Sequence, residues 1–145
     1  MSEAIAVAEQ AVAADEVLAG LRQSGSTAPV DYAQLAQFTP NQFWAPPYLV
    51  SGLYSLAWAY RGAGQPLDAA AVMGRRVLAL QLLAGAEPSK YMPEVATTLV
   101  DQSTFLQAAR RFPEAIAVAE QAVAADEVLA GLRQSGSTAP VDYAQ

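Results

Sequence analysis

The sequence contains no cysteine and no histidine, and only one of its eight basic residues is a lysine. Without thiols and imidazoles the chain forms no disulfides, no zinc fingers, and no Ser–His or Cys–His catalytic arrangements. It also lacks a phosphate-binding GxxxxGK loop. The net charge of −6 has the wrong sign for a nucleic-acid binder. We therefore expect a non-enzymatic protein that takes no metal, no cofactor and no nucleic acid.

Charged residues make up only 15% of the chain and hydrophobic residues 53%, a composition that excludes disorder. No residue between Tyr32 and Tyr60 is charged, but the apolar run that remains after its prolines and polar residues covers only 48–60. That run is shorter than the ~20 residues that a membrane span needs. The N-terminus carries Glu3 and Glu9 instead of basic residues, so no secretory signal is predicted. We expect a cytoplasmic protein without membrane contact.

One long segment occurs twice in the chain. Residues 3–34 recur letter for letter as residues 114–145, at an offset of 111. Each copy holds five acids and one arginine, so the acidity belongs to the two ends and the middle is mildly basic. Independent drift would have scattered substitutions between the copies. We expect either a recent tandem duplication or, in preference, a segment cut or engineered from an array with a 111-residue period.

Apolar residues recur at steps of three and four nearly throughout, which predicts helices and no sheet. Prolines followed by acids mark the helix starts, and glycines such as Gly131 mark the ends. The expected helices cover about 3–22, 47–62, 66–84, 92–109 and 113–133, with a short one near 30–38. The helix of the second copy shows an alanine-rich contact face formed by Ala115, Val118, Ala122, Ala125, Leu129 and Leu132.

A weaker repeat lies inside the long one. Residues 69–85 align without gaps to 115–131 at an offset of 46, whereas the step back to 4–20 is 19 residues longer. The extra residues fall in an irregular or short-helical insertion at 29–47. Helices that alternate with a period of a few tens of residues predict a helical solenoid.

The signature positions of these units resemble those of the tetratricopeptide repeat family. The first unit has Leu56-Ala57, Tyr60, Gly64 and Asp68-Ala69, and the second has Leu99, Leu106, Phe112, Glu114-Ala115, Ala119 and Ala122. Two positions depart from the family pattern: Arg76 stands where a small residue is usual, and Arg110 stands where glycine is usual. The units are most similar to long arrays in bacterial regulatory proteins.

This resemblance implies an all-α, right-handed solenoid of helical hairpins at 47–85 and 92–131, within a single domain of residues 1–145. Residues 3–20 would form an unpaired second helix. The function it implies is that of a protein–protein interaction scaffold that holds a protein or peptide partner.

Aromatic residues supply the candidate partner site, since eight of the twelve lie between Tyr32 and Tyr60. Tyr54, Trp58 and Arg61 are spaced i, i+4 and i+7, hence on one helical face. The resemblance implies that they line the ligand groove, where the rings would hold an apolar side chain and Arg61 a carboxylate. Phe43 and Trp44, beside two prolines, form a second candidate. Packing of Tyr54 and Trp58 under the insertion, with Phe43 and Trp44 filling the core, remains the alternative interpretation.

The charged pairs of the chain have simpler expected roles. Asp15-Glu16 and the identical pair Asp126-Glu127 are adjacent acids that diverge by ~100° on a helix, so we expect them to lie on a solvated face. Arg75 and Arg76 are expected either to be solvated or to partner the acidic ends.

The repeated segment also predicts a second function class, a structural module that assembles with itself and has no natural ligand. Solenoids ordinarily end in atypical caps, whereas both ends here are interior pieces of the repeat. We expect head-to-tail association or helix exchange that closes a ring or continues as a filament. The expected contacts are the alanine-rich faces of both copies: Ala115, Val118, Ala122, Leu129 and Leu132, and Ala4, Val7, Ala11, Leu18 and Leu21.

Overall fold

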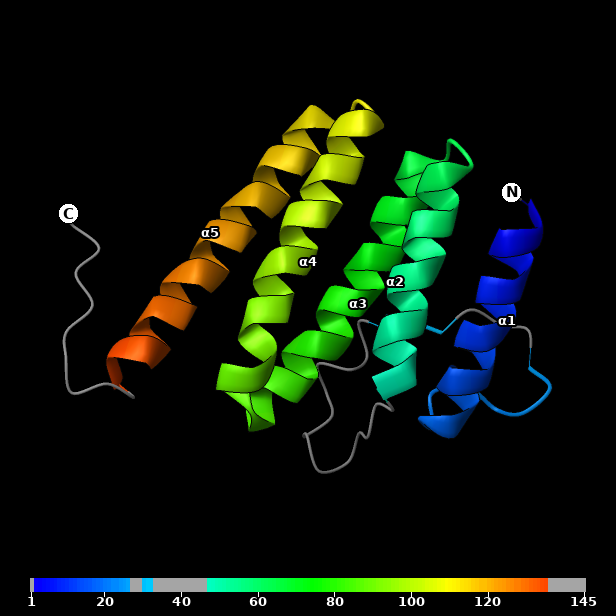
Figure 1. The fold of residues 1–145 in the computed structure, drawn as a ribbon, viewed down its shortest axis with the longest axis horizontal. Coiled ribbons are helices and arrows are strands. Elements are labelled where there is room, and N and C mark those ends of the chain that lie inside the picture. Colours follow the sequence, from blue (N-terminus) through cyan, green and yellow to red (C-terminus); the bar gives the residue numbers. More distant parts are fainter. Residues whose placement is uncertain (1, 27–29, 33–46, 136–145) are drawn as a thin grey trace.

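The computed structural model describes residues 2–26, 30–32 and 47–135, and throughout these ranges the regular structure is helical, without a strand (Figure 1). The all-α prediction is confirmed for this part of the chain. The insertion at 29–47 and the short helix expected near 30–38 fall mostly outside the described residues. The helices are α1 (Ser2–Leu18), α2 (Pro47–Gly62), α3 (Pro66–Ala86), α4 (Pro88–Ala108) and α5 (Phe112–Ser135).

The helices lie side by side in chain order, each packed against the next (Figure 1). The centre of the core is built by α2, α3 and α4, whose inward residues are aliphatic or aromatic at helical spacing. Burying one such side chain contributes about 1.5–3 kcal/mol. The largest fully buried side chains are Phe105, Leu49, Leu53, Leu56, Met73, Leu80, Leu99 and Val95.

Helix α3 is long and apolar, with a mean hydropathy of 1.3 over 18 residues, of which 44% are buried. By length and hydropathy alone it would suffice to cross a bilayer. It lies between α2 and α4, however, and carries Arg75 and Arg76 near its middle. The high hydropathy of α3 is therefore explained by its packing between two other helices.

The turn from α2 to α3 depends on a glycine in the left-handed conformation. Gly64 has φ 77°, and its amide donates to the carbonyl of Arg61 at 3.1 Å. The next amide, of Gln65, reaches back to the carbonyl of Tyr60 at 2.9 Å. This pair of bonds closes a helix C-terminus in the Schellman geometry, which glycine adopts at little cost.

The turn from α4 to α5 repeats this geometry 46 residues later. Arg110 has φ 61°, and within the described ranges it is the one residue that has a positive φ without being a glycine. Its amide donates to Gln107 at 3.0 Å, and the amide of Arg111 donates to Leu106 at 2.8 Å. The position where Arg110 replaces the usual glycine therefore still takes the glycine conformation.

The predicted start of the fourth helix near residue 92 is wrong. Helix α4 begins at Pro88, with only Glu87 between it and the last residue of α3, and Pro93 lies inside it. A proline at the first helical position has no amide to lose, so Pro88 is a good start. Pro93 instead leaves the carbonyl of Ser89 without the donor four residues on.

The two copies of the repeated segment end their helices differently. The end expected near residue 22 is wrong for the first copy, whereas the helix of the second copy ends close to the expected 133. Helix α1 stops at Leu18 and turns at Gly20, which has φ 79°. Helix α5 runs on to Ser135 and includes Gly131, the counterpart of Gly20. Because the two copies have identical sequences, tertiary contacts and not local helix propensity determine where each helix ends.

Candidate functional site

Tyr54 and Trp58 form an aromatic face on α2 that is half-exposed, with 41% and 44% of their surfaces accessible. The two ring centroids lie 6.1 Å apart. Trp58 also packs edge-on against buried Phe105 of α4, with 5.0 Å between centroids. The Trp58 ring is thus fixed at one edge and accessible at the other, so the structure places it neither wholly in the core nor free in solvent.

Arg76 of α3 ties this face to α4. Its guanidinium lies 5.1 Å from the centroid of the Tyr54 ring and donates to the carbonyl of Val50 at 3.2 Å and to the hydroxyl of Thr98. The carboxylate of Glu94 stands 3.8 Å away. The expectation that Arg76 is solvated is wrong, because only 13% of its side chain is exposed. Burial lowers the pKa of its guanidinium.

The other predicted binding residues are Arg61, Phe43 and Trp44. Arg61 is exposed near the end of α2. Phe43 and Trp44 lie outside the described residues. On α4, the positions 46 residues after Tyr54, Trp58 and Arg61 are also exposed and carry neutral side chains: Val100, Thr104 and Gln107.

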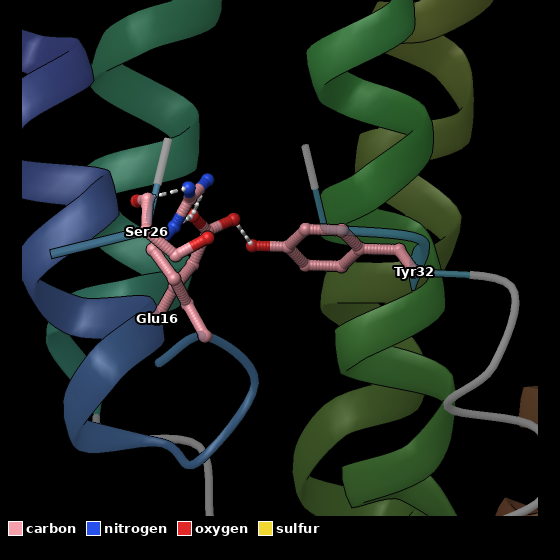
Figure 2. A network of polar contacts seen from close by, with 4 residues as sticks. Glu16, Ser26 and Tyr32 are labelled. Atoms are coloured by element: carbon pink, nitrogen blue, oxygen red, sulfur yellow. Dashed lines mark hydrogen bonds and ion pairs between the residues drawn. The ribbon is translucent and has the colours of Figure 1, made fainter. Parts of the chain in front are cut away.

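A second cluster, which the sequence did not reveal, surrounds Glu16 at the end of α1 (Figure 2). Its carboxylate is buried, with 3% of the side chain exposed, and accepts from Arg22 Nε at 3.0 Å and Nη2 at 2.9 Å. Its other oxygen accepts the hydroxyl of Tyr32 at 2.6 Å. Arg22 further donates to the carbonyl of Ser26 at 3.0 Å. The expected solvated position of Glu16 is therefore wrong, whereas its copy Glu127 is exposed as expected.

The Glu16 cluster connects α1 to the rest of the molecule. Tyr32 is buried beside α3, where it shares a hollow with Ala71 and Arg75. The hydrogen bond from Tyr32 to Glu16 thus joins the end of α1 to a segment packed on α3. Asp15, next to Glu16, is half-buried, and burial raises its pKa above 3.8.

We expect α1 to detach in alkaline solution. Burial first, and then the hydrogen bond to Glu16, raises the pKa of Tyr32 above the 10.0 of a free tyrosine. The unfolded phenol ionises near pH 10 while the folded one keeps its proton, so this stabilisation is full below pH 10 and is lost as the pH rises above it. Circular dichroism should show α1 melting in that range. The Tyr32→Phe variant should lack this step, and an unchanged alkaline transition in it would refute the assignment.

The repeated helix buries a different face in each copy. In α1 the apolar residues buried in the cluster with α2 are Ile5 at 9% exposure and Val12 at 4%. In α5 the counterparts Ile116 and Val123 are 59% and 57% exposed.

The alanine-rich face shows the reverse distribution. In α5 this face is buried or half-buried against the chain's own helices. In α1 the residues at the corresponding positions within the helix are exposed. Leu21, beyond the end of α1, is half-buried. The predicted contact residues are therefore occupied in α5, at Ala115, Val118, Ala122, Leu129 and Leu132, and free in α1, at Ala4, Val7, Ala11 and Leu18.

An open apolar hollow of about 590 Å³ lies beside the free face of α1, lined by Val7 and Ala11 and by Gly52, Ser55 and Ala59 of α2. Within residues 2–26, 30–32 and 47–135, no group of three or more acids lies close enough together to hold a metal ion. Comparison with protein-family models, with curated proteins and with solved structures finds no match to this chain.

Proposed function

We propose that the protein is a non-enzymatic interaction scaffold of the tetratricopeptide type, acting in the cytoplasm. The fold would be a right-handed solenoid of two helical hairpins, α2–α3 and α4–α5, with α1 as an additional second helix. The proposal is supported by the two hairpin turns, whose hydrogen bonds and left-handed residues Gly64 and Arg110 recur at an offset of 46. A helical-hairpin repeat produces this recurrence.

Trp58 is the observation that carries the binding proposal. Its ring is fixed against buried Phe105 yet 44% exposed, and rigid, accessible aromatic residues dominate the energetics of protein interfaces. Arg61, one turn further along α2, adds a positive charge to the same helical face. The ligand is a peptide or protein segment that presents an apolar side chain close to a carboxylate.

Selection of peptides from a random library tests this function. Peptides enriched on the wild-type chain should carry an apolar residue near an acid, and the Trp58→Ala variant should bind them at least ~30-fold more weakly, because hot-spot residues contribute 2 kcal/mol or more. Calorimetric titration measures the affinity. Leu67→Ala is the matched control, since Leu67 is 43% exposed at the start of α3, and it should bind like the wild type. Equal affinity of wild type and Trp58→Ala would contradict the proposal.

A self-assembling repeat module is the second candidate function. It is favoured by the observation that the identical helices α1 and α5 bury different faces, so that each leaves exposed the face that the other uses. In this case Trp58→Ala would leave association between copies unchanged.

A further inference from the structure

The exposed side of α5 has the same side chains as the side of α1 that packs on α2. Ile116 and Val123 of α5 occupy the positions of Ile5 and Val12 in α1. The first two are 59% and 57% exposed, and the second two are 9% and 4% exposed. The structure thus contains, within one chain, both an uncovered face and the surface that covers an identical face.

We propose that α5 of one copy of this chain binds α2 of a second copy in the place that α1 occupies, with Ile116 and Val123 at the contact. This inference deepens the self-assembly candidate by naming the helix exchanged and the surface that receives it. It does not depend on the aromatic face of α2 that contains Trp58.

The receiving surface on α2 fits the repeated helix closely. Gly52 of α2 lies so near α1 that an added Cβ would stand 3.4 Å from Val12 Cγ2 and 3.4 Å from Asp15 Oδ2. Leu49, one turn before Gly52, and Leu53, the residue after it, are fully buried in the cluster that includes Ile5 and Val12. Because 114–135 has the sequence of 3–24, α5 presents the same side chains to this surface.

Only a second copy can bring the two surfaces together. In the chain described here α3 and α4 stand between α2 and α5 (Figure 1), so α5 does not reach α2 of its own molecule. When α5 keeps its alanine-rich face on its own α4 and places Ile116 and Val123 on a neighbour's α2, both of its apolar faces are buried.

The exchange replaces the contacts of Ile5 and Val12 on α2 by those of Ile116 and Val123. Because it joins two molecules, its equilibrium depends on concentration. Because α1 belongs to the same chain as its α2, it competes at an effective concentration on the order of millimolar. Wild-type association should therefore appear only near that concentration. A substitution that weakens the binding of α1 to α2 and leaves α5 unchanged should lower the concentration at which the copies associate.

Matched substitutions in the two copies test the exchange in the full chain. Val12→Asp puts a carboxylate into the α1–α2 contact and should lower the concentration needed for association at least ~100-fold, because an unpaired buried charge weakens that contact by this factor or more. The double variant Val12→Asp/Val123→Asp should remain a monomer, because α5 then carries the same defect. Light scattering across a concentration series gives the mass.

Cysteine pairs test the geometry directly, since the chain has no cysteine of its own. At high concentration the pair Gly52→Cys/Val123→Cys should form disulfides between chains, because Val123 takes the place of Val12 beside Gly52. The control pair Gly52→Cys/Ala117→Cys should not, because Ala6, the counterpart of Ala117, is exposed on α1. Non-reducing electrophoresis separates the linked species.

Three results would overturn the proposal. The first is a Val12→Asp variant that stays monomeric at every concentration. The second is a double variant that associates as strongly as Val12→Asp alone, which would indicate non-specific adhesion through the uncovered α2. The third is equal crosslinking of the two cysteine pairs. Loss of peptide binding in Trp58→Ala would leave all of these measurements unchanged, so the two functions are tested separately.

Discussion

Replacing Phe105 with alanine should lower the free energy of unfolding by about 3–5 kcal/mol, the range measured for phenylalanines removed from packed cores. Phe105 is 1% exposed and belongs to the cluster that joins α2, α3 and α4 through Leu53 and Met73. It also supports the edge of Trp58, at 5.0 Å between ring centroids. The cavity left by the ring would lie where three helices meet, so little collapse can compensate. Urea denaturation followed by circular dichroism measures the loss.

Phe112 provides the matched control for this substitution. It is the same residue type at the start of α5, but it is 55% exposed. Its replacement with alanine should change the free energy of unfolding by less than about 1 kcal/mol. Phe105→Leu should fall between the two, because it retains most of the buried volume. Equal losses for Phe105→Ala and Phe112→Ala would show that the helices do not pack as described.

Phe105→Ala also connects stability to the proposed binding face. Without the ring beneath it, Trp58 would have greater rotamer freedom and would lose more entropy on binding a ligand. Peptide affinity should therefore fall even under conditions where the variant remains folded. The proposed binding face is in this sense an extension of the core.

The helices were predictable because the signals that produce them are local. The spacing of apolar residues predicted the interior of every described helix. Pro66 predicted the start of α3, and Gly64 predicted the turn before it. Arg110 shows the strength of the pattern, since its position takes the left-handed conformation although the residue is not glycine. Pro93 shows its limit: the sequence offers two prolines five residues apart, and the earlier one begins the helix.

The polar clusters were not predictable because they depend on which helices meet. The same acid is buried as Glu16 and exposed as Glu127, so no property of the surrounding letters distinguishes the two. Arg76 reached a buried position because its long side chain spans from α3 to the carbonyl of Val50 and the hydroxyl of Thr98. The sequence of two adjacent arginines does not indicate that one of them forms hydrogen bonds to two neighbouring helices.

Replacing Glu16 with alanine should weaken the attachment of α1 by about 2–4 kcal/mol, because buried Tyr32 would lose its acceptor and Arg22 would lose two of its hydrogen bonds. The carboxylate receives two bonds from Arg22 and one from Tyr32, and all three are lost together. Hydrogen exchange of the α1 amides should show this loss as faster local opening, while the amides of α3 and α4 keep their protection.

Glu127→Ala removes the same atoms from the same sequence in the other copy, where the side chain is exposed. Its effect on stability should stay within about 0.5 kcal/mol. Because local propensity is identical at the two sites, the difference between the variants measures the tertiary contribution alone. Glu16→Ala should in addition promote association between copies, since a loosened α1 leaves α2 open to the α5 of a neighbour. Similar effects of the two substitutions would mean that the Glu16 cluster does not hold α1 in place.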